Sequence, residues 1–387
     1  MLQTQTKAPP GLRKTTETFA AGAKSLAQRY FVSAEIFAKE QKTIFSKQWV
    51  LVGHQSQIAR AGDYFISEVA GESLIVVRPP SSDYGAASDR RSTIRGFYNM
   101  CRHRGTRLRE DQSGHASAIQ CPYHAWTYAI DGRLLGAPHM DDVPGFDKAD
   151  YSLHPVHLGL WEGFIFVSLA DSPAPLDKWF APLAGKFAHW NLPKLRSAKR
   201  IDYDVQANWK LIFENYSECY HCPGVHPALS KLSPYDSAEN DLTEGAVLGG
   251  FMRITKGNSL TMSGKSCALS VGDFSEEDFH RVFYYSIFPN MLLSLHPDYA
   301  MVHQLRPLSP ERTLILCDWF FHPEASEQKD FKPQDAIEFW DMTNKQDWHV
   351  CELSQQGIGS RAYEPGPYSS RESIPAAWDR YYLRFIG

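Results

Sequence analysis

The sequence has no apolar run of about eighteen residues or more, so no segment is expected to span a membrane. Its first thirty residues carry five basic side chains but no apolar stretch, which argues against a secretory signal peptide. Neither sign of charge dominates, because the formal net charge is only -4 over 387 residues. We therefore expect neither nucleic acid nor an anionic membrane surface as a partner.

Cysteine is scarce, and its number is odd, since the chain has seven. A chain of 387 residues can bury a stabilising core without disulfide bonds. We therefore expect a reducing, cytoplasmic location in which some thiols are kept for metal binding. The sequence also lacks a dinucleotide-binding glycine fingerprint and a flavin motif, so neither a bound dinucleotide nor a flavin is expected in this chain.

The distribution of apolar residues divides the chain into three segments. Residues 1–45 read as a polar arm followed by a helix that begins after Ser33, whose side chain suits an N-cap. Residues 46–170 consist of short apolar runs separated by turn residues, which predicts a small antiparallel β-domain. Asp131-Gly132 indicates a hairpin within this domain.

The third segment, residues 171–387, opens with a linker and then mixes strands with helices. The helices are expected around residues 178–190, 206–222 and 333–356. A Ser/Asp/Gly-rich stretch at 79–91 in the preceding segment is expected to be a surface loop. The predicted fold class is α+β, a small antiparallel β-domain followed by a catalytic domain of antiparallel sheet flanked by helices.

Two short motifs in the β-domain each combine one cysteine with one histidine. They are Cys101-x-His103 and Cys121-x-x-His124, and both fall at turns between expected strands. Two cysteines and two histidines would also suit tetrahedral zinc, although zinc motifs usually pair like with like. One thiolate and one imidazole from each loop suit a Rieske-type [2Fe–2S] cluster, whose reduction potential is about -150 to +300 mV.

A second set of metal-binding side chains lies in the stretch from Asn208 to Pro227. Glu218 and His221 are three residues apart and would share one helical face, while Pro223-Gly224 should break the helix and bring His226 back towards His221. Two imidazoles and one carboxylate form the facial triad of non-haem Fe(II) oxygenases. Taken alone, the histidines could equally be ordinary core or surface residues.

The same stretch contains a C-x-x-C pair, Cys219 and Cys222. It could be a redox pair, but in this context we favour small side chains that pack on a helix. The zinc-protease motif is disfavoured, because it requires two histidines four residues apart on a helix.

The third ligand is expected from the helix near the C-terminus. Asp347 falls within an apolar stripe at helical spacing, where an unpaired carboxylate would be costly unless a metal offset its burial. The stripe consists of Ile337, Trp340, Asn344, Asp347 and Cys351. Asp341 and Glu352 lie off this stripe and are expected to be solvated. The alternative for Asp347 is an ion pair with a lysine or arginine.

The motifs CRHRG, CPYHAW and NWKLIFENYSECYHCPGVHP together resemble the large subunit of Rieske non-haem iron oxygenases, over nearly the whole chain from about residue 30. The resemblance implies a catalytic domain of the helix-grip type. It also implies that Cys101 and Cys121 hold one iron of the cluster and that His103 and His124 hold the other. The segment QDWHVCELSQQG resembles the one that carries the ligand aspartate. The family often has glycine where this chain has Ala125.

The resemblance further implies a head-to-tail homotrimer. In such a ring His124 of one subunit faces Glu218 and His221 of the next, and Glu218 is an electron-transfer bridge rather than a ligand. We hypothesise that Glu218 accepts hydrogen bonds from both histidines. Electrons would come from a separate flavin and iron–sulfur reductase. Trp126, beside the second cluster loop, could shield the cluster, line the docking face for this reductase, or belong to the core.

Within this family the chain is most similar to the branch that acts on quaternary ammonium compounds such as glycine betaine, choline and carnitine. The expected reaction is O2-dependent hydroxylation or oxidative N-demethylation of a small betaine-like substrate. Tyr216 could contribute to an aromatic box for the cationic head, or be a core aromatic. One alternative is an aromatic-ring-hydroxylating dioxygenase alpha subunit, and a non-enzymatic alternative is a Rieske electron-transfer protein.

Overall fold

The computed structural model describes residues 11–80 and 94–387, so most of the predicted loop at 79–91 lies outside the described residues. The chain divides into two compact units. One is Ile44–Phe180, and the other combines the N-terminal segment up to Thr43 with Ala181–Gly387. The smaller unit extends past the expected boundary at residue 170 because the rings of Trp161 and Phe180 stack with their centroids 4.2 Å apart.

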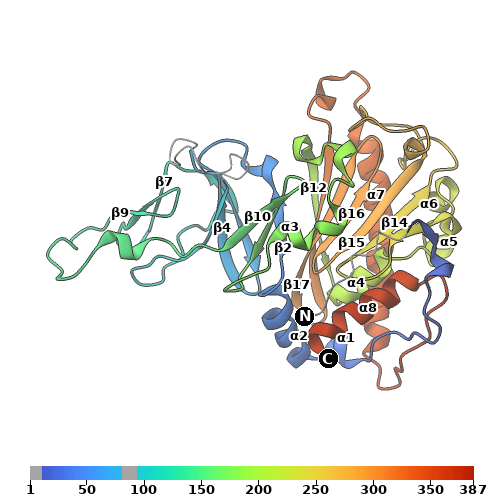
Figure 1. Cartoon of the computed structure of the whole chain (residues 1–387), viewed down its shortest axis with the longest axis horizontal. Helices are drawn as coiled ribbons and strands as arrows, with labels where there is room; N and C mark the ends of the chain where they lie inside the picture. The colour runs from blue at the N-terminus through green and yellow to red at the C-terminus, as the bar shows by residue number, and fades with distance from the viewer. Residues whose placement is uncertain (1–10, 81–93) are drawn as a thin grey trace, which may run out of the picture. The chain divides into compact units, whose positions relative to one another are not determined.

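The smaller unit is built from short antiparallel strands (Figure 1). Among the described residues they form three sheets, with the strand orders β10-β11-β2, β5-β4-β3-β6 and β7-β8-β9. The strands are β2 (Val50–His54), β3 (Asp63–Val69), β4 (Glu72–Val77), β5 (Arg95–Tyr98), β6 (Ser113–His115), β7 (Ala118–Gln120), β8 (Thr127–Ala129), β9 (Leu134–Gly136), β10 (His157–Trp161) and β11 (Phe164–Ser168). The unit ends with a short helix, α3 (Leu176–Trp179).

The hairpin predicted at Asp131-Gly132 is confirmed, because β8 and β9 pair antiparallel on either side of it. Gly132 has a φ of 94°, a conformation that glycine adopts without steric cost. The side chain of Asp131 accepts a hydrogen bond of 3.0 Å from the amide of Arg133, which closes the turn. Local turn chemistry therefore determines this part of the fold.

The larger unit is organised around one antiparallel sheet. Eight strands of the described chain form it, in the order β1-β13-β14-β15-β16-β17-β18-β12. Their bounds are β1 (Arg13–Lys14), β12 (Arg196–Val205), β13 (Glu239–Leu242), β14 (Val247–Arg253), β15 (Arg281–Ile287), β16 (Met291–Leu295), β17 (Ala300–Ser309) and β18 (Arg312–Phe321). The N-terminal arm thus adds its own short strand to the edge of the catalytic sheet.

Helices in this unit pack against the sheet and against one another (Figure 1). They are α1 (Arg29–Val32), α2 (Ala34–Glu40), α4 (Trp209–Tyr216), α5 (Cys222–Val225), α6 (Pro227–Leu232), α7 (Pro333–Ile358) and α8 (Ser373–Ile386). The predicted N-cap of α2 is confirmed, since the Ser33 hydroxyl accepts a hydrogen bond of 3.2 Å from the amide of Ile36. The long helix expected at 333–356 is α7, and the α+β fold class is confirmed. No helix in the described ranges is long and apolar enough to cross a membrane.

One helix prediction was wrong, and another was right in position but too long. The helix expected at 178–190 is replaced by α3 and short 3-10 turns, because Pro182 and Gly185 interrupt it. The helix expected at 206–222 ends at Tyr216. Its last turn is capped by Ser217, whose hydroxyl donates a 2.6 Å hydrogen bond to the carbonyl of Phe213 and lies 2.6 Å from the hydroxyl of Ser286 on β15.

Candidate metal centres

The two Cys/His motifs of the smaller unit form two similarly closed turns. The amide of Cys101 donates to the carbonyl of Thr106 at 2.8 Å, and the amide of Cys121 donates to the carbonyl of Trp126 at 2.8 Å. Both cysteines are unpaired and buried. His103 and His124 are exposed, and their ring centroids lie 4.8 Å apart. Each turn therefore places its thiol inwards and its imidazole outwards.

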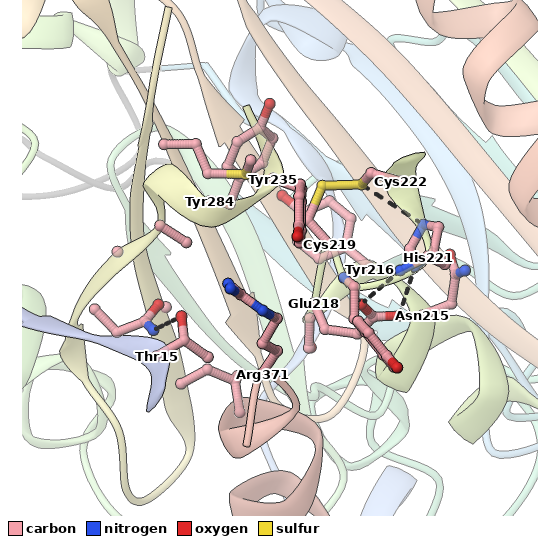
Figure 2. Close-up of a pocket in the computed structure, with 18 of the residues that line it drawn as sticks. Thr15, Asn215, Tyr216, Glu218, Cys219, His221, Cys222, Tyr235, Tyr284 and Arg371 are labelled. Atoms are coloured by element: carbon pink, nitrogen blue, oxygen red, sulfur yellow. Dashed lines mark hydrogen bonds and ion pairs between the residues drawn. A yellow bond between two sulfur atoms is a disulfide. The ribbon is translucent and has the colours of Figure 1, made fainter. Parts of the chain in front are cut away.

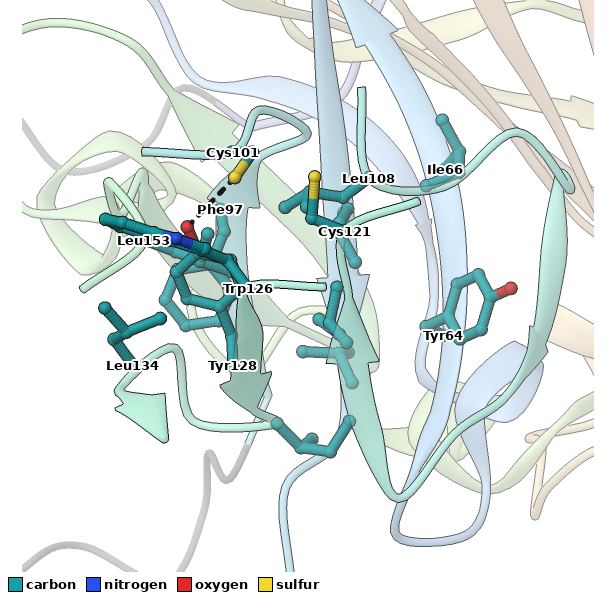
Figure 3. Close-up of a cluster of buried hydrophobic side chains, with 14 residues drawn as sticks. Tyr64, Ile66, Phe97, Cys101, Leu108, Cys121, Trp126, Tyr128, Leu134 and Leu153 are labelled. Atoms are coloured by element: carbon teal, nitrogen blue, oxygen red, sulfur yellow. Dashed lines mark hydrogen bonds between the residues drawn. The ribbon is translucent and has the colours of Figure 1, made fainter. Parts of the chain in front are cut away.

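The two thiols lie at one end of the buried core of this unit (Figure 3). The Tyr128 hydroxyl lies 3.3 Å from the Cys101 sulfur and accepts a 3.0 Å hydrogen bond from the amide of Arg102. Burial raises the pKa of the Cys101 thiol, and the hydrogen bond from Tyr128 opposes that rise. Two buried sulfur ligands and two solvent-facing imidazoles fit the ligand set of a Rieske cluster.

Trp126 belongs to the core of this unit. Its side chain is buried, which among the three alternatives for Trp126 fits core packing and not a docking face. The indole stacks on the ring of His103, with centroids 4.8 Å apart and an interplanar angle of 8°. It also meets Phe146 and Tyr151 edge-on. Trp126 therefore fixes the orientation of one of the two exposed imidazoles.

The second site brings together His221, His226 and Asp347, as the sequence predicted. One ligand atom from each lies within 4.8 Å of the other two. The Nε2 atoms of the histidines are 3.2 Å apart, and one carboxylate oxygen of Asp347 lies 3.2 Å from Nε2 of His221 and 2.8 Å from Nε2 of His226. Two nitrogens and one carboxylate oxygen converging in this way fit a divalent iron site with open positions.

Short helices and one long helix position these three side chains. His221 immediately precedes α5, His226 lies between α5 and α6, and Asp347 lies in the middle of α7. The expected common helix for Glu218 and His221 was wrong, because α4 ends at Tyr216 and both residues follow it in a loop. Pro223 lies in the first turn of α5, where proline is tolerated, so it helps to start a helix rather than end one.

Both histidines are held by hydrogen bonds at their outer nitrogens. Nδ1 of His221 lies 2.5 Å from a carboxylate oxygen of Glu218, and Nδ1 of His226 lies 2.8 Å from the amide oxygen of Gln346. The other Glu218 oxygen accepts hydrogen bonds from the amides of Tyr220 and His221. Such contacts set the ring tautomer and leave Nε2 free to bind a metal.

The carboxylates determine the electrostatics of this site. Burial lowers the pKa of His221, but hydrogen bonds to Asp347 and Glu218 outweigh it and raise the pKa to about 10. Burial raises the pKa of Asp347, but hydrogen bonds from His221 and His226 outweigh it, and the pKa is lowered. The site therefore favours a positive charge at the point where the three side chains meet.

The expectation for Cys219 and Cys222 was wrong, because the structure pairs them in a disulfide. Their Cα atoms are 5.0 Å apart, which is within the range that a disulfide spans. The helix on which they were expected to pack ends before them, so the chain is free to bring the two sulfurs together. The disulfide closes a short loop that contains His221, and Glu218 directly precedes this loop.

A cavity of ≈ 320 Å³ opens beside the three converging side chains (Figure 2). Tyr216 lies in its wall, with its hydroxyl 2.8 Å from that of Ser294. The ring of Tyr284 lies 6.1 Å from that of Tyr216 and 6.4 Å from that of Trp340, measured between centroids. Three aromatic rings therefore surround one part of the cavity.

Sequence reasoning missed some residues of this site. Gln346 is adjacent to Asp347 but lies off the apolar stripe, so its contact with His226 could not be read from helical spacing. Arg371 lines the cavity from the segment that precedes α8 and carries no recognisable motif. Asp341, expected to be solvated, is partly buried and accepts a 2.9 Å hydrogen bond from the Tyr203 hydroxyl.

Two family models match the chain. Residues 48–147 match the Rieske [2Fe–2S] domain, and residues 192–386 match the ring hydroxylating alpha subunit (catalytic domain). The first segment contains the two Cys/His turns, and the second contains the three converging side chains and the cavity. The matches thus assign a metal chemistry to each unit separately.

Characterised relatives agree with these models. The chain is 34% identical to the glycine betaine monooxygenase oxygenase subunit of Chromohalobacter salexigens, over 90% of this chain and 82% of that protein. It is 30% identical to the Escherichia coli carnitine monooxygenase oxygenase subunit, over 90% and 88% of the two chains. A quaternary ammonium Rieske monooxygenase solved with its substrate L-carnitine superposes with a TM-score of 0.76 at 26% identity, over 96% and 99% of the two chains. The chain therefore belongs to the ring-hydroxylating alpha subunits of Rieske non-haem iron oxygenases, oxidoreductases with a [2Fe–2S] domain and a non-haem iron domain.

Proposed function

We propose that this protein is the oxygenase component of a two-component monooxygenase that oxidises a small quaternary ammonium compound. The observation that carries this proposal is the position of His221, His226 and Asp347 in the wall of a cavity that also contains three aromatic rings. The names of the relatives, which include oxygenase subunits for glycine betaine and carnitine, support the same substrate class.

The aromatic rings suit a cation without acidic hydrogens. A trimethylammonium group cannot donate strong hydrogen bonds, and the faces of tyrosine and tryptophan attract it through the ring quadrupole. Burial raises the pKa of Tyr216 and that of Tyr284, so both stay neutral phenols. We assign Tyr216, Tyr284 and Trp340 to this cation-binding box.

The residues that would hold the metals follow from the two clusters of donors. Cys101 and Cys121 hold one iron of the [2Fe–2S] cluster, and His103 and His124 hold the other. His221, His226 and Asp347 hold the mononuclear ferrous ion, which supplies the activation of O2 when bound. Glu218 and Gln346 hold the two imidazoles by Nδ1, so that Nε2 of each ring faces the common point. By this assignment the Rieske domain is residues 46–170, the catalytic domain is 171–387, and the segment 1–45 packs on the catalytic domain.

The reaction consumes one O2, two electrons and two protons for each methyl group oxidised. One oxygen atom enters an N-methyl C–H bond and the other leaves as water. The resulting N-hydroxymethyl compound then loses formaldehyde and a proton, and the amine with one methyl group fewer remains. The electrons originate from NAD(P)H and arrive through a separate flavin and iron–sulfur reductase.

We further propose a homotrimer in which His124 of one subunit approaches Glu218 of the next. His124 is exposed at the surface of the smaller unit. Glu218 contacts Nδ1 of His221, which is one of the proposed iron ligands. A heterologous contact closes into a three-membered ring when each subunit is rotated by a third of a full turn relative to the last, which is the arrangement we propose. We place the protein in the cytoplasm, where a reducing environment keeps the Cys101 and Cys121 thiols available for the cluster. The Cys219–Cys222 disulfide is the exception to this reduced state, since the other five cysteines are free.

Turnover of the holoenzyme with a supplied reductase and NADH tests this proposal. The substrates are glycine betaine, choline, carnitine and a set of arenes, and the readouts are formaldehyde and NADH oxidation. We expect formaldehyde from at least one quaternary ammonium compound in a ratio of about one per NADH. A cis-dihydrodiol from an arene, with no formaldehyde from any amine, would show ring dihydroxylation instead.

A further inference from the structure

The cavity beside the metal-binding side chains contains a guanidinium group that no other part of the proposed function uses. Arg371 points into it, beneath the ring of Tyr235 (Figure 2). The Arg371 Cζ atom lies 4.9 Å from the centroid of that ring. In the described parts of the chain, no Asp or Glu side chain forms an ion pair with Arg371. The lining also contains the carboxylates of Glu218, Asp236 and Asp347, but none of them pairs with Arg371, so its guanidinium is available to an anionic group in the cavity.

The backbone around Arg371 is firmly positioned. Its amide donates a 3.2 Å hydrogen bond to the Ser369 hydroxyl, and the amide of Ser369 donates a 2.6 Å hydrogen bond to the carboxylate of Glu372. The amide of Tyr368 donates at 3.0 Å to the carbonyl of Ala23 in the N-terminal arm. The guanidinium is thus preorganised on a fixed turn that precedes α8. The Glu372 carboxylate accepts a hydrogen bond within that turn and forms no ion pair with Arg371.

Besides Arg371, the part of the cavity lining that the structure describes contains one lysine and no other arginine. Lys14 is exposed at the cavity rim, whereas Arg371 is partly buried. A partly buried guanidinium stacked on an aromatic ring recognises a planar carboxylate through two parallel hydrogen bonds. The cavity therefore offers one site for a quaternary ammonium group and one for a carboxylate.

We propose that Arg371 binds the carboxylate of the substrate, so that the site selects zwitterionic betaines over cationic alcohols such as choline. This inference rests on the proposed function, because it takes a quaternary ammonium head in the box of Tyr216, Tyr284 and Trp340. Tyr235 is the positioning residue, since its ring centroid lies 4.9 Å from Cζ of Arg371.

The test compares Arg371→Gln and Arg371→Lys with a matched control, Arg384→Gln. Arg384 is exposed in the last turn of α8, and its Cζ atom lies 5.4 Å from the centroid of the Tyr381 ring. Like Arg371 it lies beside a tyrosine ring, but it does not line the cavity. Binding of glycine betaine, γ-butyrobetaine and choline to each iron-loaded protein is measured by calorimetry without O2. KM and kcat for formaldehyde release are measured separately, and iron content and thermal midpoint confirm that each variant is folded.

We expect Arg371→Gln to weaken binding of both carboxylated compounds by about 10- to 100-fold, the value of a charge-assisted hydrogen bond. The same variant should leave the affinity for choline within about twofold. Arg371→Lys should bind the carboxylated compounds more tightly than Arg371→Gln but less tightly than the wild type. Arg384→Gln should bind all three compounds like the wild type. If Arg371→Gln lost as much affinity for choline as for the betaines, the proposal would be overturned. That result would point to an ion pair of Arg371 with a neighbouring subunit.

The two proposals fail in different ways. If the wild-type protein releases no formaldehyde but binds betaines in an Arg371-dependent manner, the proposed reaction is wrong and the carboxylate site stands. If formaldehyde forms but Arg371→Gln binds betaines as tightly as the wild type, the reaction stands and the carboxylate site is wrong.

Discussion

Ala125 occupies a backbone conformation that alanine rarely adopts. Its φ is 57°, and it directly follows His124 in the second Cys/His turn. The left-handed conformation costs a residue with a Cβ atom about 1–2 kcal/mol, and glycine avoids that cost. This explains in physical terms why glycine is frequent at this position in the resembled family.

We therefore expect Ala125→Gly to raise the free energy of unfolding of the smaller unit by about 0.5–1 kcal/mol. Chemical denaturation of the protein, followed through the visible absorption of the cluster, measures the change. Ala129→Gly on β8 is the control, and it should be destabilising because the strand residue has ordinary backbone angles. Lower stability of Ala125→Gly than of the wild type would show that this turn is not strained.

Gln346 is the residue that holds His226 on the side away from the metal. Its amide oxygen lies 2.8 Å from Nδ1 of His226. Gln346→Leu should weaken Fe(II) binding by about 10- to 100-fold, while Gln346→Glu should retain most of the affinity because it keeps the acceptor. Anaerobic titration of the iron-free protein with Fe(II) gives both constants. Unchanged affinity in the leucine variant would mean that Gln346 does not orient the ligand.

At the scale of elements, the position of α4 depends on a buried ion pair with α2. Lys210 and Glu40 are both fully buried, and Nζ of Lys210 lies 2.6 Å from the carboxylate. Glu40 also accepts hydrogen bonds from the Trp209 indole at 2.9 Å and from the Tyr382 hydroxyl at 2.5 Å. Helix α4 leads directly into the loop of Glu218, so this network fixes where that loop begins.

Lys210→Met should lower the free energy of unfolding by about 3–5 kcal/mol, because it leaves Glu40 buried without a cation. The double variant Lys210→Met with Glu40→Gln should recover much of this loss. Lys345→Met removes an exposed pair with Asp341 and should cost less than about 1 kcal/mol. Urea unfolding followed by tryptophan fluorescence measures all three. If Lys210→Met lowered the free energy of unfolding as little as Lys345→Met does, the buried ion pair of Lys210 and Glu40 would not have the role assigned to it.

The elements also show what the sequence could and could not predict. The candidate donors Cys101, Cys121, His221 and His226 could be named from spacing within short stretches, and Asp347 from the helical periodicity that extends through α7. The end of α4 could not be predicted, since it depends on Ser217 meeting Ser286 on a distant strand. The disulfide could not be predicted either, because it depends on where α4 ends. Nor could the cavity, because its lining comes from segments that are far apart in the sequence.

For the molecule as a whole, the proposed path of electrons between subunits runs through Glu218. Glu218→Gln keeps the shape of the side chain but removes its charge, so both metals should remain bound. We expect the rate at which a pre-reduced cluster is oxidised by O2 and substrate to fall by about 10- to 100-fold. Stopped-flow absorbance follows this oxidation, with Glu352→Gln, outside the cavity, as the control. Wild-type rates in Glu218→Gln would exclude the bridging role.

The central claim is that one chain holds a Rieske cluster and a separate mononuclear iron at His221, His226 and Asp347. Iron and sulfide analysis of the wild type and of Asp347→Ala, combined with electron paramagnetic resonance of the reduced cluster, tests it most directly. The wild type should contain about three iron atoms and about two sulfides per chain. Asp347→Ala should contain about two of each, with an unchanged cluster spectrum. An equal iron content in the two proteins, or loss of the cluster signal in Asp347→Ala, would contradict the claim.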